Sequence, residues 1–267
     1  MLYRIDCFEE NMINPITNRE YDSTWIIFVL NDEDYNMFCG SINGCAYTLK
    51  VSKKYKHWKM SMGDFISFNT LTGKNMIIVA SEKDYKDALE EYRGHTSFDK
   101  YLREYEDTVL VHSTTRANYE NILKEGCLKS WNQLKREQAI AEDKPIGHYL
   151  GDPVELRDYI LFGHGTTGEI VVNSKQSNRI EMDENSEYIT GARLYFDMKK
   201  IAEAGLLVRD GGEIKVKGML PLEPYLLFAA TWDKIGLDSE KSTPKIFSDA
   251  SDQYFDSMIR ARSEELK

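Results

Sequence analysis

The longest apolar runs of this sequence are short, and their length limits what the chain can form. They cover residues 25–30 and 225–230, whereas a helix that crosses a membrane needs about 20 predominantly apolar residues. Runs of this length between turn-forming Asn, Asp and Gly are typical of β-strands. Residues 1–6 also lack the apolar stretch of a signal peptide. We therefore predict a soluble cytoplasmic protein that contacts no membrane.

The composition is that of a folded protein without a structural metal. Hydrophobic residues make up 42% of the 267 residues and aromatic residues 12%, which is enough to build one large core or two ordinary ones. The four cysteines form no Cys-x-x-Cys pair, and no two of the five histidines stand at ligand spacing with a carboxylate between them. We predict no metal site and buried thiols in a reducing compartment.

The net charge of −10 disfavours a broad phosphate-binding surface. A local exception is residues 50–59, where five lysines alternate with Tyr55, His57 and Trp58. Cations interleaved with aromatic rings are found in sites for single-stranded nucleic acid. The alternative is a solvated strand face with Tyr55 and Trp58 buried.

The first part of the chain, residues 1–106, is predicted to be a mainly β domain with a helical connector. Its expected strands follow the apolar runs and are separated by turn-rich stretches. They cover residues 24–30, 45–51, 64–68 and 75–80. Charged residues 82–106, with apolar side chains at spacings of three and four, predict the connecting helices.

The second part, residues 107–267, opens with a strand over 108–111, a polar turn over 112–115 and a helix. Thr114 or Thr115 can cap that helix, and Gly126 can end it. A second helix is expected from Asp152, with Pro153 at its first position, to Gly163.

The remaining elements follow from the same signals. We expect strands over 192–197, 206–208, 213–216 and 225–231, a short helix over 198–204, a tight turn at 210–212 and an amphipathic helix over 247–259. Docking of the last helix on its own domain is the favoured interpretation, and binding of a partner is the alternative.

Two stretches of the second part resemble one enzyme superfamily. The stretch 111–114, Val-His-Ser-Thr, followed by 121–126 resembles the first strand, His-x-Thr turn and first helix of ADP-ribosyltransferases, in the branch of the poly(ADP-ribose) polymerases. The blocks 192–205 and 211–221 resemble RNA 2′-phosphotransferases, which share that fold. The resemblance spans residues 109–232 and implies an α+β protein with an ADP-ribosyltransferase-like split β-sheet domain.

The resemblance implies roles for several side chains in binding NAD, which is the substrate of this superfamily. His112, with Ser113 and Thr114 beside it, is similar to the histidine that hydrogen-bonds the adenosine ribose. Tyr149 is similar to the tyrosine that stacks on nicotinamide, and Tyr195 is a rival for that role.

Glu213 is the implied catalytic carboxylate, acting with His112 and Tyr149. Breaking an N-glycosidic bond develops oxocarbenium charge on a ribose, and a fixed carboxylate stabilises that charge. The same group can act as a general base, which contributes roughly 10² to 10⁴-fold. The alternative is a solvated strand face on which Glu213 pairs with Lys215 or Arg209.

We therefore predict an NAD-dependent ADP-ribosyltransferase, a glycosyltransferase that modifies a macromolecular acceptor, either nucleic acid or protein. Toxins and host-conflict effectors are frequent in the superfamily, so such a role is expected, and a neutralising protein partner is left open. One alternative is an RNA 2′-phosphotransferase, although that family carries an apolar residue at the position of Glu213. Its basic residues would correspond to Arg116, Arg179 and Arg193. The other alternative is a catalytically inactive NAD-fold binding module.

Overall fold

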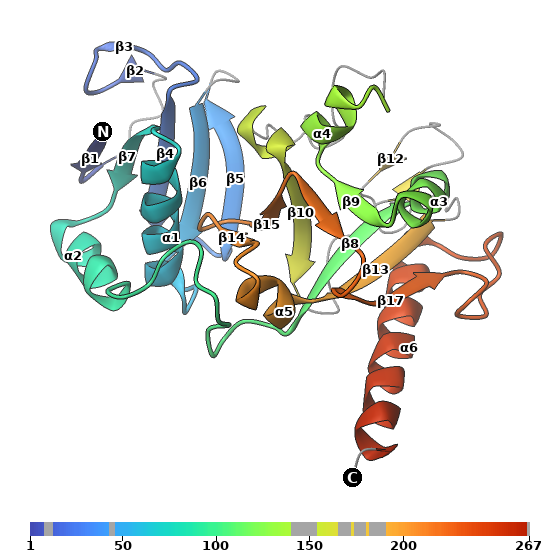
Figure 1. Cartoon of the computed structure of the whole chain (residues 1–267). Helices are drawn as coiled ribbons and strands as arrows, with labels where there is room; N and C mark the ends of the chain where they lie inside the picture. The colour runs from blue at the N-terminus through green and yellow to red at the C-terminus, as the bar shows by residue number, and fades with distance from the viewer. Residues whose placement is uncertain are drawn as a thin grey trace. The chain divides into compact units, whose positions relative to one another are not determined.

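The chain forms two compact units that alternate along the sequence (Figure 1). The computed structural model describes residues 1–7, 13–42, 46–139, 154–164, 172–173, 180–181 and 191–265. The first unit consists of Met1–Asp99, Trp131–Tyr159 and Val208–Lys215, and the second of Lys100–Ser130, Ile160–Leu207 and Val216–Lys267. The chain thus returns to the first unit twice, whereas the sequence prediction divided it once, between residues 106 and 107. Helices and strands occur in both units, so the protein is mixed α+β.

The first unit is built around a five-stranded sheet. Its strands, in spatial order, are β1 (Leu2–Ile5), β7 (Asn75–Val79), β4 (Trp25–Asn31), β6 (Ala46–Ser52) and β5 (Met37–Ile42). The first four are parallel, and β5 is antiparallel at the edge. Residues of β4 are buried on both faces, as in other largely parallel sheets. The apolar runs predicted as strands at 24–30, 45–51 and 75–80 are confirmed by β4, β6 and β7. A two-stranded ribbon joins β2 (Ile13–Asn14) and β3 (Arg19–Glu20).

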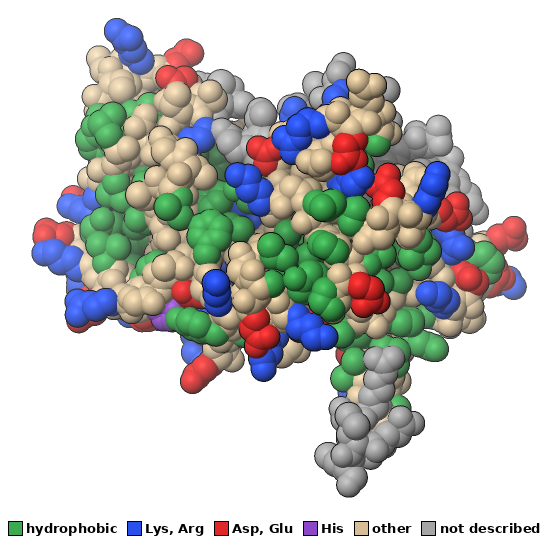
Figure 2. All heavy atoms as spheres, viewed as in Figure 1, with side chains coloured by type: hydrophobic (Ala, Val, Ile, Leu, Met, Phe, Trp, Pro, Cys, Tyr) green, Lys and Arg blue, Asp and Glu red, His purple; other side chains and the backbone are tan. Residues whose placement is uncertain are grey.

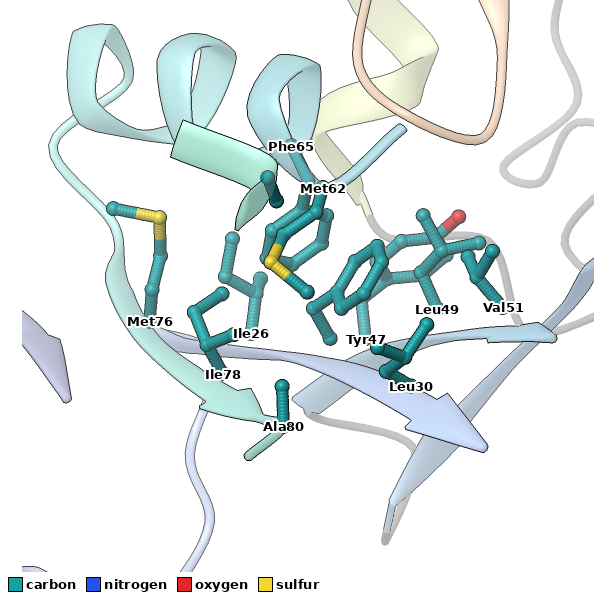
Figure 3. Packing of buried hydrophobic residues seen from close by; sticks show 12 residues of the cluster. Ile26, Leu30, Tyr47, Leu49, Val51, Met62, Phe65, Met76, Ile78 and Ala80 are labelled. Atoms are coloured by element: carbon teal, nitrogen blue, oxygen red, sulfur yellow. The ribbon is translucent and has the colours of Figure 1, made fainter. Parts of the chain in front are cut away.

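Helix α1 (Trp58–Leu71) covers one face of this sheet and corrects the predicted strand at 64–68. Met62 and Phe65, three positions apart, both point into the core with Ile26, Leu49 and other sheet residues (Figure 3). This spacing is that of a helix face, and the strand prediction mistook it for a short apolar run.

Helix α2 (Glu82–Glu91) begins at Ser81, whose side chain accepts a hydrogen bond from the Asp84 amide at 3.1 Å. The helical pattern predicted over residues 82–106 is right only for this first part. The chain turns at Gly94, which has a φ of +88°, and no further helix occurs in 92–106.

The second unit contains strands in the order β10 (Tyr159–His164), β8 (Val109–Thr115), β13 (Gly191–Asp197) and β17 (Leu226–Thr231), all antiparallel to their neighbours. Two short ribbons pair β9 (Cys127–Lys129) with β16 (Met219–Pro221) and β11 (Val172–Asn173) with β12 (Ile180–Glu181).

The polar turn predicted at 112–115 is instead the end of strand β8. Helix α3 (Arg116–Glu125) follows at once, because the Thr115 hydroxyl caps it by accepting from the Asn118 amide at 3.2 Å. Gly126 ends the helix with a φ of +71°, as predicted. A strand that ends in polar residues was read as a turn because its last residues lack apolar side chains.

The helix predicted up to Gly163 is also corrected. Residues 154–158 form a 3₁₀ helix, η2 (Val154–Asp158), and the chain then becomes strand β10. Ile160 and Phe162, two positions apart, are both buried, which is the period of a strand. The predicted start at Asp152 and Pro153 lies outside the described residues.

The last elements agree with the sequence prediction. They are β13, α5 (Met198–Glu203), β14 (Leu207–Arg209), β15 (Ile214–Lys217), β17 and α6 (Pro244–Glu265). Helix α4 (Trp131–Arg136), earlier in the chain, was not predicted. Phe255 of α6 packs against Val111, Tyr195 and Ala230, so the amphipathic helix docks on its own unit. Among the described residues, the helices are each too short or too polar to cross a membrane.

Candidate functional site

His112 lies at the middle of β8 in the second unit and is held by the neighbouring strand. Its Nδ1 is 3.1 Å from the Leu161 carbonyl oxygen, and its ring meets Phe162 edge-on at 5.8 Å between centroids. A carbonyl oxygen only accepts hydrogen bonds, so Nδ1 carries the proton and a neutral ring presents Nε2 as an acceptor. Burial lowers the pKa of His112, and the bond to Leu161 opposes this only in part. The imidazole is therefore neutral near pH 7.

Thr114 shares the face of β8 that carries His112, because side chains alternate along a strand. Thr114 lies opposite Ala192 and His112 opposite Leu194 of β13. The His-x-Thr spacing thus places a half-buried imidazole and a buried hydroxyl on one face, directly before helix α3.

Ser113 lies on the other face of β8. Its hydroxyl accepts a hydrogen bond from Nη1 of Arg193 at 3.0 Å, and the two residues are direct cross-strand partners. The structure therefore does not bring Ser113 together with His112 and Thr114.

A buried polar network occupies this second face, and the sequence prediction missed its centre, Asp252 of α6. The Arg193 guanidinium binds both carboxylate oxygens, with Nε 3.0 Å from Oδ1 and Nη2 3.3 Å from Oδ2. The Tyr195 hydroxyl donates to Oδ1 at 2.6 Å. Burial raises the pKa of both Asp252 and Tyr195. An aspartate among the apolar residues of an amphipathic helix was the one sequence signal that indicated a buried partner.

Tyr195 does not fit its predicted contact with nicotinamide. Its side chain is fully buried, and its ring stacks on Phe255 at 4.3 Å with an interplanar angle of 7°. The ring is thus part of the core between β13 and α6. Tyr149, the other candidate, lies outside the described residues.

Two of the arginines considered for a phosphotransferase site, Arg116 and Arg193, are engaged in other ion pairs. Arg193 is 1% exposed and paired with Asp252. Arg116 pairs with Glu120 at 3.2 Å and with Asp233 at 3.1 Å. Arg179 lies outside the described residues.

Glu213 closes a tight turn of the first unit, as predicted. Oδ1 of Asp210 accepts from the amides of Gly212 at 3.0 Å and Glu213 at 2.7 Å, and the Asp210 amide donates to the Glu213 carbonyl at 3.2 Å. Gly211 has a φ of +94°, and a Cβ there would lie 2.4 Å from the Ser61 carbonyl oxygen. The turn therefore requires glycine and holds the Glu213 backbone at two points.

The solvated strand face considered for this region is wrong. Lys215 is 0% exposed, and its Nζ binds Oδ2 of Asp210. The same Nζ lies 4.1 Å from the centre of the Phe68 ring and 4.7 Å from that of Tyr159. Arg209 is also buried and donates to the Asp99 carbonyl at 3.2 Å. A carboxylate and two aromatic faces replace water around the ammonium group.

His112 and Glu213 belong to different units. Contacts within the second unit bring His112 together with Thr114, and contacts within the first unit bring Glu213 together with Asp210. These contacts do not connect His112 with Glu213.

The lysine-rich stretch 50–59 is neither one strand face nor a continuous basic surface. It runs from β6 through a turn into α1, which begins at Trp58. Carboxylates pair with three of its lysines: Lys53 with Asp84, Lys54 with Asp34, and Lys59 with Glu91. Figure 2 shows acidic and basic side chains intermixed on the visible face. A phosphate would have to displace these carboxylates, so the stretch offers little support for a nucleic-acid site.

Comparisons with protein-family models, curated proteins and solved structures found no match to this chain. Within the described residues, no group of three or more His, Cys, Asp and Glu side chains could hold a metal ion. The resemblance to ADP-ribosyltransferases therefore stays a prediction from the sequence.

Proposed function

We propose that this protein is an NAD-dependent ADP-ribosyltransferase that modifies a macromolecular acceptor. The observation that carries the proposal is the arrangement of His112 and Thr114 on β8, shortly before helix α3. His112 and Thr114 share one face, and the neutral imidazole of His112 is fixed through Nδ1 by the Leu161 carbonyl. A fixed acceptor nitrogen is suited to receive a hydrogen bond from a ribose hydroxyl, the role that the resemblance assigns to His112.

In the proposed reaction, the bond between C1′ of the nicotinamide ribose and the pyridinium nitrogen breaks. The electron pair of that bond goes to the nitrogen and neutralises nicotinamide. The acceptor's nucleophilic atom forms the new bond to C1′, and its proton goes to a base. Glu213 is proposed to stabilise the positive charge that develops on the ribose and to take that proton. Its amide is fixed by Asp210, which favours a preorganised position for the side chain.

The test is nicotinamide release from NAD by the purified full chain, with cell extract as a mixed acceptor. We expect His112→Ala to weaken NAD binding, measured by calorimetry. Glu213→Gln should lower kcat by about 10² to 10³-fold while the affinity for NAD is retained. His57→Ala and Glu203→Gln serve as controls, since they change a half-buried histidine and an exposed glutamate outside the proposed site.

A well-folded wild-type protein that neither binds NAD nor releases nicotinamide would refute the proposal. Equal kcat in wild type and Glu213→Gln would refute the role of the carboxylate. The RNA 2′-phosphotransferase alternative requires basic residues that reach a phosphate, and the burial of Arg193 against Asp252 disfavours it. The acceptor class, and a role as a toxin or host-conflict effector, stay predictions.

A further inference from the structure

The ion pair between Lys215 and Asp210 is buried in the first unit, where such pairs are costly. Lys215 is 0% exposed and the Asp210 side chain 9% exposed. Taking both charges out of water is costly, and well-packed apolar residues in their place are often as stable or more stable. Stability alone is therefore a weak reason for a lysine at this position.

The two oxygens of the Asp210 carboxylate have different partners. Oδ2 binds Lys215, while Oδ1 accepts from the amides of Gly212 and Glu213. Rotation of the carboxylate would break both sets of contacts at once. The position of the ammonium group, held between Phe68 and Asp210, thus determines the orientation of the group that holds the Glu213 amide.

Packing fixes the rest of this turn. The backbone of Gly211 approaches the Ser61 carbonyl so closely that a methyl group does not fit. A Cβ on Gly212 would lie 3.2 Å from Leu49 and 3.5 Å from the Tyr47 hydroxyl. Burial is the main cause that raises the pKa of Tyr47, and the negative charge of Glu213 raises the same pKa by a smaller amount. The Glu213 side chain therefore leaves a backbone that is held by both hydrogen bonds and packing.

We infer that Asp210 and Lys215 are positioning residues, which hold the Glu213 carboxylate in place for its catalytic role. This inference rests on the proposed function. A catalytic group must be held within about 0.5 Å of its productive position by residues that are themselves fixed. Because Glu213 acts on charge that develops in the transition state, a loosened turn lowers kcat and leaves the KM for NAD unchanged.

The experiment compares Asp210→Ala, Asp210→Asn and Lys215→Met in the full chain by two readouts. Amide hydrogen exchange at Gly212 and Glu213, followed by NMR, reports on the turn without turnover. We expect exchange to accelerate about ten-fold in Asp210→Ala, which loses both hydrogen bonds, and less in Asp210→Asn, whose Oδ1 still accepts. Nicotinamide release should show a lowered kcat with unchanged KM in Asp210→Ala and Lys215→Met, and a partial recovery in Asp210→Asn.

Asp238 provides a matched control. Its carboxylate accepts from the Glu240 amide at 3.0 Å and pairs with Lys241 at 2.9 Å, the same kind of arrangement on an exposed turn. Asp238→Ala should leave kcat unchanged. Folded Asp210→Ala protein with wild-type kcat would overturn the inference, as would a lost kcat accompanied by an equal rise in KM. A wild-type protein that releases no nicotinamide would overturn the proposed function itself. This result is read from the wild type without any variant, so it is distinct from a failure of the inference, which is read from Asp210→Ala.

Discussion

Replacing Arg193 with methionine is predicted to destabilise the second unit through Asp252. The substitution keeps a long side chain but removes the hydrogen bonds to the Asp252 carboxylate and to the Ser113 hydroxyl. Removing one partner of a buried ion pair costs about 3–5 kcal/mol, because the other charge is left without compensation. The Asp252 side chain is still 13% exposed and keeps its bond from the Tyr195 hydroxyl. We therefore expect the low end of this range, about 3 kcal/mol at pH 7.

The loss should depend on pH with a defined sign. Burial already raises the pKa of Asp252 above its ordinary value, and the Arg193 guanidinium opposes that rise. A carboxyl group whose pKa is higher in the folded state stabilises the fold below its unfolded pKa, and this contribution is lost as the pH rises through the folded pKa. Without Arg193 the pKa of Asp252 rises further. The loss of stability in Arg193→Met should therefore become smaller as the pH is lowered.

The assay is hydrogen–deuterium exchange with mass spectrometry, which separates the two units. A loss of 3 kcal/mol corresponds to exchange on the order of 100-fold faster in peptides from α6, with α1 of the first unit as the internal reference. The double variant Arg193→Met/Asp252→Asn removes both charges and keeps an acceptor for Tyr195, so most of the stability should return. A change in α6 exchange below about five-fold at pH 7, corresponding to less than 1 kcal/mol, would refute the reasoning. So would a double variant as unstable as the single one.

Three further predictions concern single positions. The pKa of His112, measured by NMR titration, should lie below 6.5. Because its pKa is lower in the folded state, the contribution of His112 to stability is present above the unfolded pKa and is lost as the pH falls through the folded pKa. Gly211→Ala should lower the free energy of unfolding of the first unit, measured by thermal denaturation, by more than about 2 kcal/mol. The new methyl group would lie 2.4 Å from the Ser61 oxygen, and the backbone has a positive φ. Gly218→Ala also has a positive φ but open space around its Cβ, so it should cost about 1 kcal/mol. Thr115→Ala should cost about 1 kcal/mol in urea denaturation, and Thr115→Ser should restore most of it; equal stability of the two variants would contradict the cap.

Local signals in the sequence predicted those elements whose boundaries are set locally. Gly126 and the turn at 210–212 are examples, because a positive φ is a property of the residue and its neighbours. The errors at 64–68 and at 154–163 have one cause. Each stretch holds too few apolar residues for its period to be recognised from the sequence alone, and which of them are buried depends on the sheet or helix against which it packs.

The candidate site was predictable to a similar extent. The His-x-Thr spacing was visible in the sequence, but the shared face of His112 and Thr114 depends on strand β8, which the prediction ended at residue 111. Arg193 and Asp252 are far apart in sequence and meet only because α6 docks on β13. The burial of Lys215 likewise depends on Phe68, a residue of a helix that the sequence did not predict.

The alternation of the two units along the chain has a consequence for synthesis and dissection. The segment Val208–Lys215 belongs to the first unit, and Lys215 covers the ring of Phe68 there. A nascent chain that has left the ribosome only as far as residue 106 therefore lacks part of this unit's interior. Neither unit corresponds to one contiguous stretch of the chain. A truncation chosen at the apparent boundary would leave the N-terminal piece with an exposed aromatic surface and an incomplete fold.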